Sequence, residues 1–223
     1  MTPRATPVPE LIPLEVGPSS PSAIAQARAD SARLPYTAAD IQFMVGMIGH
    51  HAQAIEMSKM APSHGASPTI RVLAGRIINA QQDEIILMQR WLRDRNQVPP
   101  MIMPTLPAAD GAMDHSQHMG HEMAGMSGMS GMNHAMMPGM LSVDQMQQLD
   151  RARGAEFDRL FLTFMIQHHE GATSMVSSLF ATDGAGQDEA VFKFASDVNV
   201  DQTTEIARMR LLLSALPTQR STK

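Results

Sequence analysis

The sequence predicts an all-α protein built as a four-helix bundle, and two observations lead to that prediction. Apolar residues recur at helical spacing in both halves of the chain, between residues that cap or end helices. The two halves also repeat each other, because residues 41–51 align without gaps on residues 159–169. A single helical hairpin cannot bury its apolar face alone, so two repeated hairpins should pack together as a bundle.

The first hairpin is expected over residues 37–98. Thr37 is a candidate N-cap, and apolar residues at helical spacing follow it as far as Met60. Ser67 followed by Pro68 is typical of a second helix start, because proline is tolerated at the first helical position. That helix should end near Asn96, before two prolines. Residues 1–36 are rich in proline and are expected to form a disordered arm without an apolar stretch of signal-peptide length.

The second hairpin is expected over residues 142–217, after a loop of different composition at 99–141. The loop combines methionine, histidine and glycine without helical or strand periodicity, which predicts a flexible low-complexity segment. Ser142 and Gln145 fit a capping box at the start of a short helix, and Gly154 should break it. Two long helices follow and should end before Pro217.

The repeat extends beyond the paired histidines. Asp40 corresponds to Asp158, and Met57 corresponds to Met175. After a shift of three residues, the second helices of the two hairpins also match, with Gln81, Glu84, Ile85 and Met88 falling on Gln202, Glu205, Ile206 and Met209.

Candidate metal ligands lie on the first helix of each hairpin. Met47 and His51 are four residues apart, as are Met165 and His169, so each pair shares one helix face. Asp40 and Asp158 lie within about 40° of that face and could orient the imidazoles. The alternative to metal binding is a structural role, in which the methionine fills the core and the histidine is held by hydrogen bonds. We expect it to hold for Met57, Met60, Met88, Met175 and Met209. His50 and His168 point away from the methionine face, which favours a structural role.

The loop is a second, separate candidate. Thioethers bind Cu(I), which is soft, and imidazole suits both oxidation states of copper. A donor every few residues would let the chain wrap an ion in several ways. The alternative is a linker whose biased composition has no role in binding. The candidate ligands in the loop are Met113, His115, His118, Met119, His121, Met123, Met126, Met129, Met132, His134, Met136 and Met137.

Composition excludes several other functions. The chain of 223 residues has no cysteine, so thiolate chemistry and disulfides are absent. Its net charge is −5 and no basic block is present, which argues against nucleic-acid binding. No apolar run is long enough to predict a membrane span. No glutamate is followed by histidine at the spacing of di-iron bundles, and no catalytic constellation is visible, so we expect no enzymatic activity.

The repeated pattern D-x-x-F-x-x-x-M-I-x-H-H-x-x-A-x-x-M resembles the family called domain of unknown function 305. The similarity covers nearly all of Thr37 to Leu216 except the central loop, and it is strongest from Gly154 to Met175. It implies a ferritin-like bundle and bacterial, often exported proteins, some of which bind copper. Carried over by position, its motif residues are Met47, His50, His51, Met165, His168 and His169. The first half departs from the second, with Gly49 and Gln53 in place of Gln167 and Gly171.

These observations predict that the protein binds copper for sequestration, tolerance or delivery. Cu(I) is the favoured ion, with Cu(II) and Ag(I) as alternatives, and a copper-handling protein is a further candidate partner. The resemblance implies a periplasmic or other extracytoplasmic location. The alternative function is a stress or interaction module whose methionines scavenge oxidants by forming sulfoxides.

Overall fold

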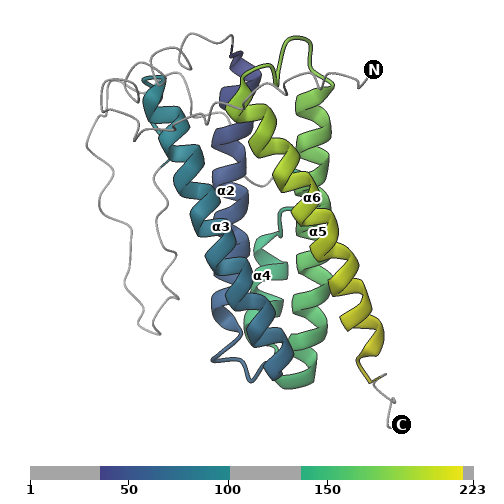
Figure 1. Cartoon of the computed structure of the whole chain (residues 1–223). Helices are drawn as coiled ribbons and strands as arrows, with labels where there is room; N and C mark the ends of the chain where they lie inside the picture. The colour runs from purple at the N-terminus through teal and green to yellow at the C-terminus, as the bar shows by residue number, and fades with distance from the viewer. Residues whose placement is uncertain (1–35, 101–136, 218–223) are drawn as a thin grey trace, which may run out of the picture. The chain divides into compact units, whose positions relative to one another are not determined.

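The computed structural model describes residues 36–100 and 137–217, and within these ranges the chain is helical with no strand. Five helices are described, α2 (Ala38–Met60), α3 (Pro68–Asp94), α4 (Val143–Arg151), α5 (Gly154–Phe180) and α6 (Glu189–Ala215). Helix α2 packs on α3, α5 packs on α6, and α2 and α5 join the two pairs, as Figure 1 shows. The predicted all-α, ferritin-like bundle is therefore confirmed. No helix in the described ranges is long and apolar enough to cross a bilayer.

The predicted helix starts are confirmed by their caps. Thr37 and Asp40 form a capping box on α2, in which the Thr37 side chain and the Asp40 backbone satisfy each other. Ser67 caps α3, with Pro68 at its first position. Ser142 and Gln145 form the capping box of α4. These local signals place each helix end, and so they fix which residues reach the middle of the bundle.

The bundle core consists of two hydrophobic clusters. One surrounds Phe157 and Phe161, and we call it the Phe161 cluster. The other contains Trp91 and Val191, and we call it the Trp91 cluster. On α2, residues 50 and 51 fall between Ile48 of the Trp91 cluster and Ala54 of the Phe161 cluster.

The segments between the two clusters are polar on all four long helices. We call this group the histidine layer, and its members are His50 and His51 on α2, Gln81 and Glu84 on α3, His168 and His169 on α5, and Gln202 and Glu205 on α6. Burying polar side chains in mid-bundle costs free energy unless they find partners. A layer of this kind in an otherwise apolar core therefore points to a binding role.

The two repeated aspartates tie the hairpins together and do not contact the histidines. The Asp40 carboxylate accepts hydrogen bonds from the Thr37 backbone N–H at 2.7 Å and from the Gly186 N–H at 2.7 Å, so it holds the α5–α6 turn. The Asp158 carboxylate accepts from the Ser67 N–H at 3.1 Å, in the α2–α3 turn. The prediction that these carboxylates orient the imidazoles is wrong, because turn N–H groups already occupy them.

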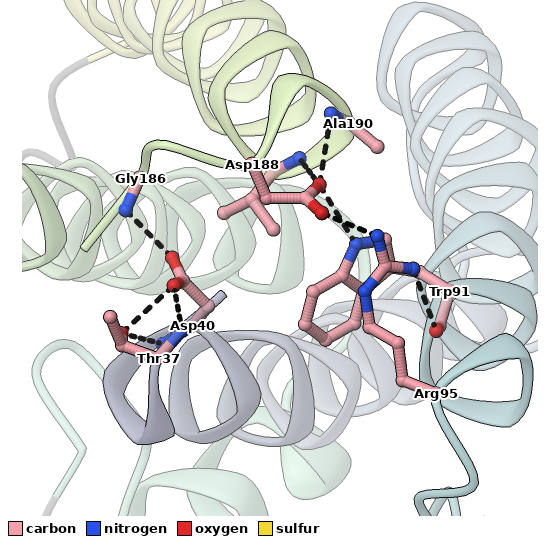
Figure 2. A network of polar contacts seen from close by, with 8 residues as sticks. Thr37, Asp40, Trp91, Arg95, Gly186, Asp188 and Ala190 are labelled. Atoms are coloured by element: carbon pink, nitrogen blue, oxygen red, sulfur yellow. Dashed lines mark hydrogen bonds and ion pairs between the residues drawn. The ribbon is translucent and has the colours of Figure 1, made fainter. Parts of the chain in front are cut away.

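A second polar network lies beside Asp40 and is drawn in Figure 2. The buried Asp188 caps α6 and accepts from the Trp91 indole N–H at 3.1 Å. It also pairs with the buried Arg95, whose guanidinium stacks over the Trp91 ring at 4.2 Å. This network fixes the end of α3 against the start of α6.

Candidate metal centre

Four histidines meet at the centre of the bundle, and each is 0 % exposed. His50 and His51 come from the middle of α2, and His168 and His169 from the middle of α5. Because α2 and α5 pack directly on each other, the two pairs converge. The His50 and His168 rings lie 3.8 Å apart between their centroids. The repeat in the sequence thus becomes a paired arrangement in space.

Two glutamates hold one histidine of each pair. The Nε2 of His51 lies 2.6 Å from a Glu84 carboxylate oxygen, and the Nε2 of His169 lies 2.7 Å from a Glu205 carboxylate oxygen. A carboxylate accepts hydrogen bonds, so Nε2 carries the proton and donates. The Nδ1 of each ring then keeps its lone pair. A carboxylate that fixes the tautomer in this way is the usual support for a metal-binding imidazole.

The other two histidines are placed differently. The His50 Nε2–H donates to the backbone carbonyl of Pro138 at 3.0 Å, which again leaves Nδ1 with a lone pair. Neither ring nitrogen of His168 has a hydrogen-bond partner among the described residues. The sequence favoured hydrogen-bonded structural roles for both, and His168 does not have the contacts that such a role requires.

Burial keeps His50 and His168 uncharged. Desolvation, helped by the neighbouring His51 and His169, lowers the pKa of His50 to about 3, against a smaller opposing effect of the Pro138 carbonyl. Desolvation also lowers the pKa of His168 well below its usual value, and the other three histidines add to the shift, against a smaller opposing effect of the His50 backbone. Neutral imidazole is the form that ligates metals.

Unsatisfied polar atoms are concentrated in the histidine layer. Of the ten buried side-chain nitrogen and oxygen atoms without a hydrogen-bond partner among the described residues, eight belong to it. They are Nδ1 of His50, His51, His168 and His169, Nε2 of His168, both amide atoms of Gln81, and Oε1 of Gln202. Each such atom costs about 1–3 kcal/mol if nothing binds it. Their concentration in one place fits a site that takes a ligand.

Carboxylates also gather on the outer side of the layer. Partial burial raises the pKa of Asp201 on α6, and the charges of Glu84, Glu205 and Asp197 raise it further. Glu84 on α3 and Glu205 on α6 therefore lie close enough to Asp201 to repel it. Such a grouping of carboxylates on α3 and α6 would favour the approach of a cation.

The two predicted methionine ligands are fully buried, but in different places. Met47 belongs to the Trp91 cluster and Met165 to the Phe161 cluster, so they flank the histidine layer from opposite sides. The core roles expected for Met57, Met88 and Met209 are confirmed by complete burial, whereas Met60 and Met175 are half-buried. Among the described residues, no group of three or more His, Asp or Glu side chains is arranged to hold a metal by itself.

The last residues of the predicted loop are packed against the bundle. We call residues 137–141 the strap. Its Pro138 carbonyl binds His50, and its Leu141 exchanges two hydrogen bonds with the Gln53 side chain, at 2.8 and 3.1 Å. The strap thus differs from the flexible loop expected there. Met137 is the one predicted loop ligand that the structure describes. The others lie outside the described residues, namely Met113, His115, His118, Met119, His121, Met123, Met126, Met129, Met132, His134 and Met136.

Sequence reasoning missed the glutamates and glutamines of the layer. Glu84 and Glu205 had been aligned as repeat positions, together with Gln81 and Gln202. Polar residues that recur within otherwise apolar helix positions are the signal that could have identified them. The aspartates were considered instead because they share the helix that carries the histidines.

Solved structures of the same fold include metal-bound proteins. A DUF305 fragment from Deinococcus radiodurans is 26% identical, with 82% of this chain and 99% of that chain covered and a TM-score of 0.61. CopM in its Cu(II)-bound form is 26% identical, with 78% and 95% covered and a TM-score of 0.54. CopM in its Cu(I)-bound form is 26% identical over the same shares of the two chains, with a TM-score of 0.52.

By sequence alone, one relative matches a short part of the chain, and a family model matches most of it. An uncharacterised protein of Acanthamoeba polyphaga mimivirus is 45% identical over 56 residues, which are 25% of this chain and 37% of that protein. The model of the domain of unknown function 305 matches residues 40–213, which include all four histidines of the layer. The chain therefore belongs to the DUF305 family.

Proposed function

We propose that this protein binds copper, and silver in its place, through the imidazoles of the histidine layer and neighbouring thioethers. The observation that carries the proposal is the set of eight polar atoms in the middle of an otherwise apolar core that have no hydrogen-bond partner in residues 36–100 and 137–217. Four of them are Nδ1 atoms of neighbouring imidazoles. A bound ion would use these lone pairs and offset the cost of burying them.

The donor set selects the ion. Imidazole nitrogen suits copper in both oxidation states, and thioether sulfur favours the soft ions Cu(I) and Ag(I). Met47 precedes His51 by one helical turn, and Met165 precedes His169 in the same way, so each hairpin offers one sulfur and one supported imidazole. Because Met47 and Met165 lie on opposite sides of the layer, the proposal is two related sites, one in each hairpin.

Two further observations support the proposal. Structures of CopM with Cu(I), Cu(II) and silver bound share this fold at 25–26% identity. In this chain, the grouped carboxylates Glu84, Glu205 and Asp201 would favour the approach of a cation.

The methionines and histidines of residues 113–137 extend the proposal. Their number and spacing would give additional, less selective capacity for Cu(I). We further propose a role in copper sequestration, tolerance or delivery outside the cytoplasm, without enzymatic activity. Fractionation of cells that make the protein would test its location.

Competition with a chromogenic Cu(I) chelator tests the proposal on the full chain. We expect the protein to withdraw more than one equivalent of Cu(I) from the chelator, and Mg(II) and Ca(II) not to bind. A variant with all His and Met of residues 113–136 replaced by Asn and Leu should retain the equivalents held by the layer. In that background, His51→Asn with His169→Asn should release most of the remaining Cu(I).

Three outcomes distinguish copper binding by the layer from binding by residues 113–136 and from oxidant scavenging. Failure to withdraw Cu(I) at micromolar protein would disprove copper binding. Cu(I) binding that is abolished by the substitutions in residues 113–136 alone would disprove the site in the layer. Accumulation of methionine sulfoxide in air, without affinity for Cu(I) or Ag(I), would favour the oxidant-scavenging alternative.

A further inference from the structure

The strap lies on one side of the histidine layer and is held there by contacts on both central helices. The α2 helix contributes His50 to the Pro138 carbonyl and Gln53 to Leu141. The α5 helix contributes Gln167, whose amide donates to the Gly139 carbonyl at 3.4 Å. Residues 137–141, the C-terminal end of the methionine-rich loop, therefore dock at a defined register.

Glycines make room for this docking. A Cβ on Gly171 would lie 2.0 Å from the Pro138 oxygen, so only glycine allows the strap to approach α5. Gly46 on α2 leaves a hollow that two methionine side chains fill, because a Cβ there would lie 3.3 Å from the Met137 sulfur and 3.3 Å from the Met175 methyl carbon. In the repeat, Phe164 stands where Gly46 does. The hollow is thus particular to the strap side.

Two methionine side chains meet over this hollow, and neither is fully buried. Met137 comes from the strap and Met175 from α5, and both are half-buried. His50 lies one helical turn, or about 6 Å along the axis, from Gly46. Its Nε2–H is fixed by Pro138, the residue next to Met137, and its Nδ1 has no partner in the part of the chain that the structure describes. Two methionine side chains and a neutral imidazole therefore lie near one another beside the strap.

From this geometry we infer that Met137 and Met175 form a soft-metal site at the edge of the histidine layer, with His50 as the nearest imidazole. The site takes a monovalent soft cation, Cu(I) or Ag(I), because thioethers supply most of its donors. It joins the methionine-rich segment to the buried histidines, since Met137 ends the first and adjoins the second. This inference rests on the proposed function and adds an entry point to it.

Simple packing is the competing explanation, because methionine fills irregular gaps well. Leucine would serve packing almost equally, at a cost below about 1.5 kcal/mol. Metal binding needs the sulfur. The substitutions Met137→Leu and Met175→Leu therefore separate the two explanations, and Met57→Leu is a matched control. Met57 is the repeat partner of Met175, but it is fully buried in the Phe161 cluster, whereas Met175 is half-buried beside the Trp91 cluster.

The experiment is a titration of the full chain, labelled with ¹³C at the methionine methyl groups, with Ag(I), which is diamagnetic. The two Leu variants assign the Met137 and Met175 signals. We expect both signals to shift together as Ag(I) is added. In chelator competition, either variant should lower the affinity of one Ag(I) equivalent at least as much as the roughly tenfold loss that removal of an outer-shell partner causes. Met57→Leu should leave that equivalent unchanged.

The outcomes distinguish this inference from the proposed function. Shifts of other methionine signals with no change at Met137 and Met175 would overturn the inference and leave copper binding intact. Unchanged Ag(I) affinity in both Leu variants would do the same. Absence of any Ag(I) binding would overturn both. Thermal melts of each variant would show whether a loss of affinity comes from unfolding. A destabilised variant would be titrated again at a lower temperature at which it is folded, so that the affinities can be compared.

Discussion

The two hairpins carry the same residues at the centre of the bundle and different residues where the strap docks. Each supplies a histidine held by a glutamate, His51 by Glu84 and His169 by Glu205, at nearly equal distances. Away from this centre the symmetry ends. Gln53 of α2 corresponds to Gly171 of α5, and one clamps the strap while the other makes room for it.

This difference explains the departures from the repeat. Positions that bind or orient the histidines are kept in both halves, because both pairs need the same support. Positions that face the strap differ, because there is one strap and it crosses both helices. The account thus assigns metal binding to the symmetric residues and access to the asymmetric ones. Each of the following predictions changes either the symmetric residues of the layer or the asymmetric residues at the strap, and leaves the other set intact.

The largest expected effect is the loss of stability of the metal-free protein in mild acid. The pKa of His50 is lowered to about 3 and that of His168 is lowered well below its usual value, so as the pH falls below about 6.5 the unfolded state takes up protons first. The groups that face them are His51 and His169, which do not offer a compensating negative charge. His50 alone should cost roughly 2 kcal/mol of unfolding free energy by pH 5, and His168 should add a loss of the same sign.

Denaturant unfolding at pH 7.5 and pH 5 measures this effect. His168→Leu removes a buried ring that makes no hydrogen bond to any described residue, and it should remove about half of the acid sensitivity. His50→Leu also breaks the bond to Pro138, so it should destabilise the protein at both pH values. Equal acid sensitivity in the wild type and in His168→Leu would contradict the burial of a neutral ring.

A smaller effect is expected from undocking the strap. Gly171→Ala should destabilise the protein by about 2 kcal/mol, because the new Cβ clashes with the Pro138 carbonyl. Gly75→Ala in α3 is the matched control, since a Cβ there meets nothing within 4 Å, and it should stabilise by up to about 1 kcal/mol. Thermal or urea unfolding compares them. A stabilising Gly171→Ala would mean that the strap does not dock as described.

The smallest expected effect concerns the glutamates. Glu84→Gln keeps an acceptor for the His51 Nε2–H but removes the charge, so Cu(I) affinity should fall by roughly tenfold. Glu205→Gln should behave alike, because the two pairs are equivalent. Asp40→Asn is the control, and it should lower stability without changing affinity. Chelator competition checks all three, and a loss confined to one glutamate would contradict the symmetry of the layer.

Much of the fold was predictable because its signals are local or repeated. The caps at Thr37, Ser67 and Ser142 are short-range signals, and the gapless repeat around the histidines pointed to two hairpins. The site was predicted in part. A helical wheel groups Met47 with His51, but it cannot show which carboxylate of another helix reaches the imidazole.

The strap was not predictable from periodicity. Its docking depends on Gly171, Gln53 and the Pro138 carbonyl, which come together only when α2 and α5 pack. A segment rich in methionine and glycine gives no local sign of such contacts. The mismatch of Gln53 and Gly171 in the repeat was the one available hint, and it can be interpreted only when the packing of α2 on α5 is known.

The most direct test of the central claim is a long-range ¹H–¹⁵N correlation spectrum of the histidine rings in the full chain, recorded before and after addition of Ag(I). The account predicts that His51 and His169 begin as Nε2–H tautomers and that their unprotonated Nδ1 signals shift when Ag(I) binds. The Nε2–H groups should remain bound to Glu84 and Glu205. Unchanged ring nitrogens in the four histidines of the layer, with Ag(I) bound elsewhere in the chain, would contradict the claim that the histidine layer is a metal site.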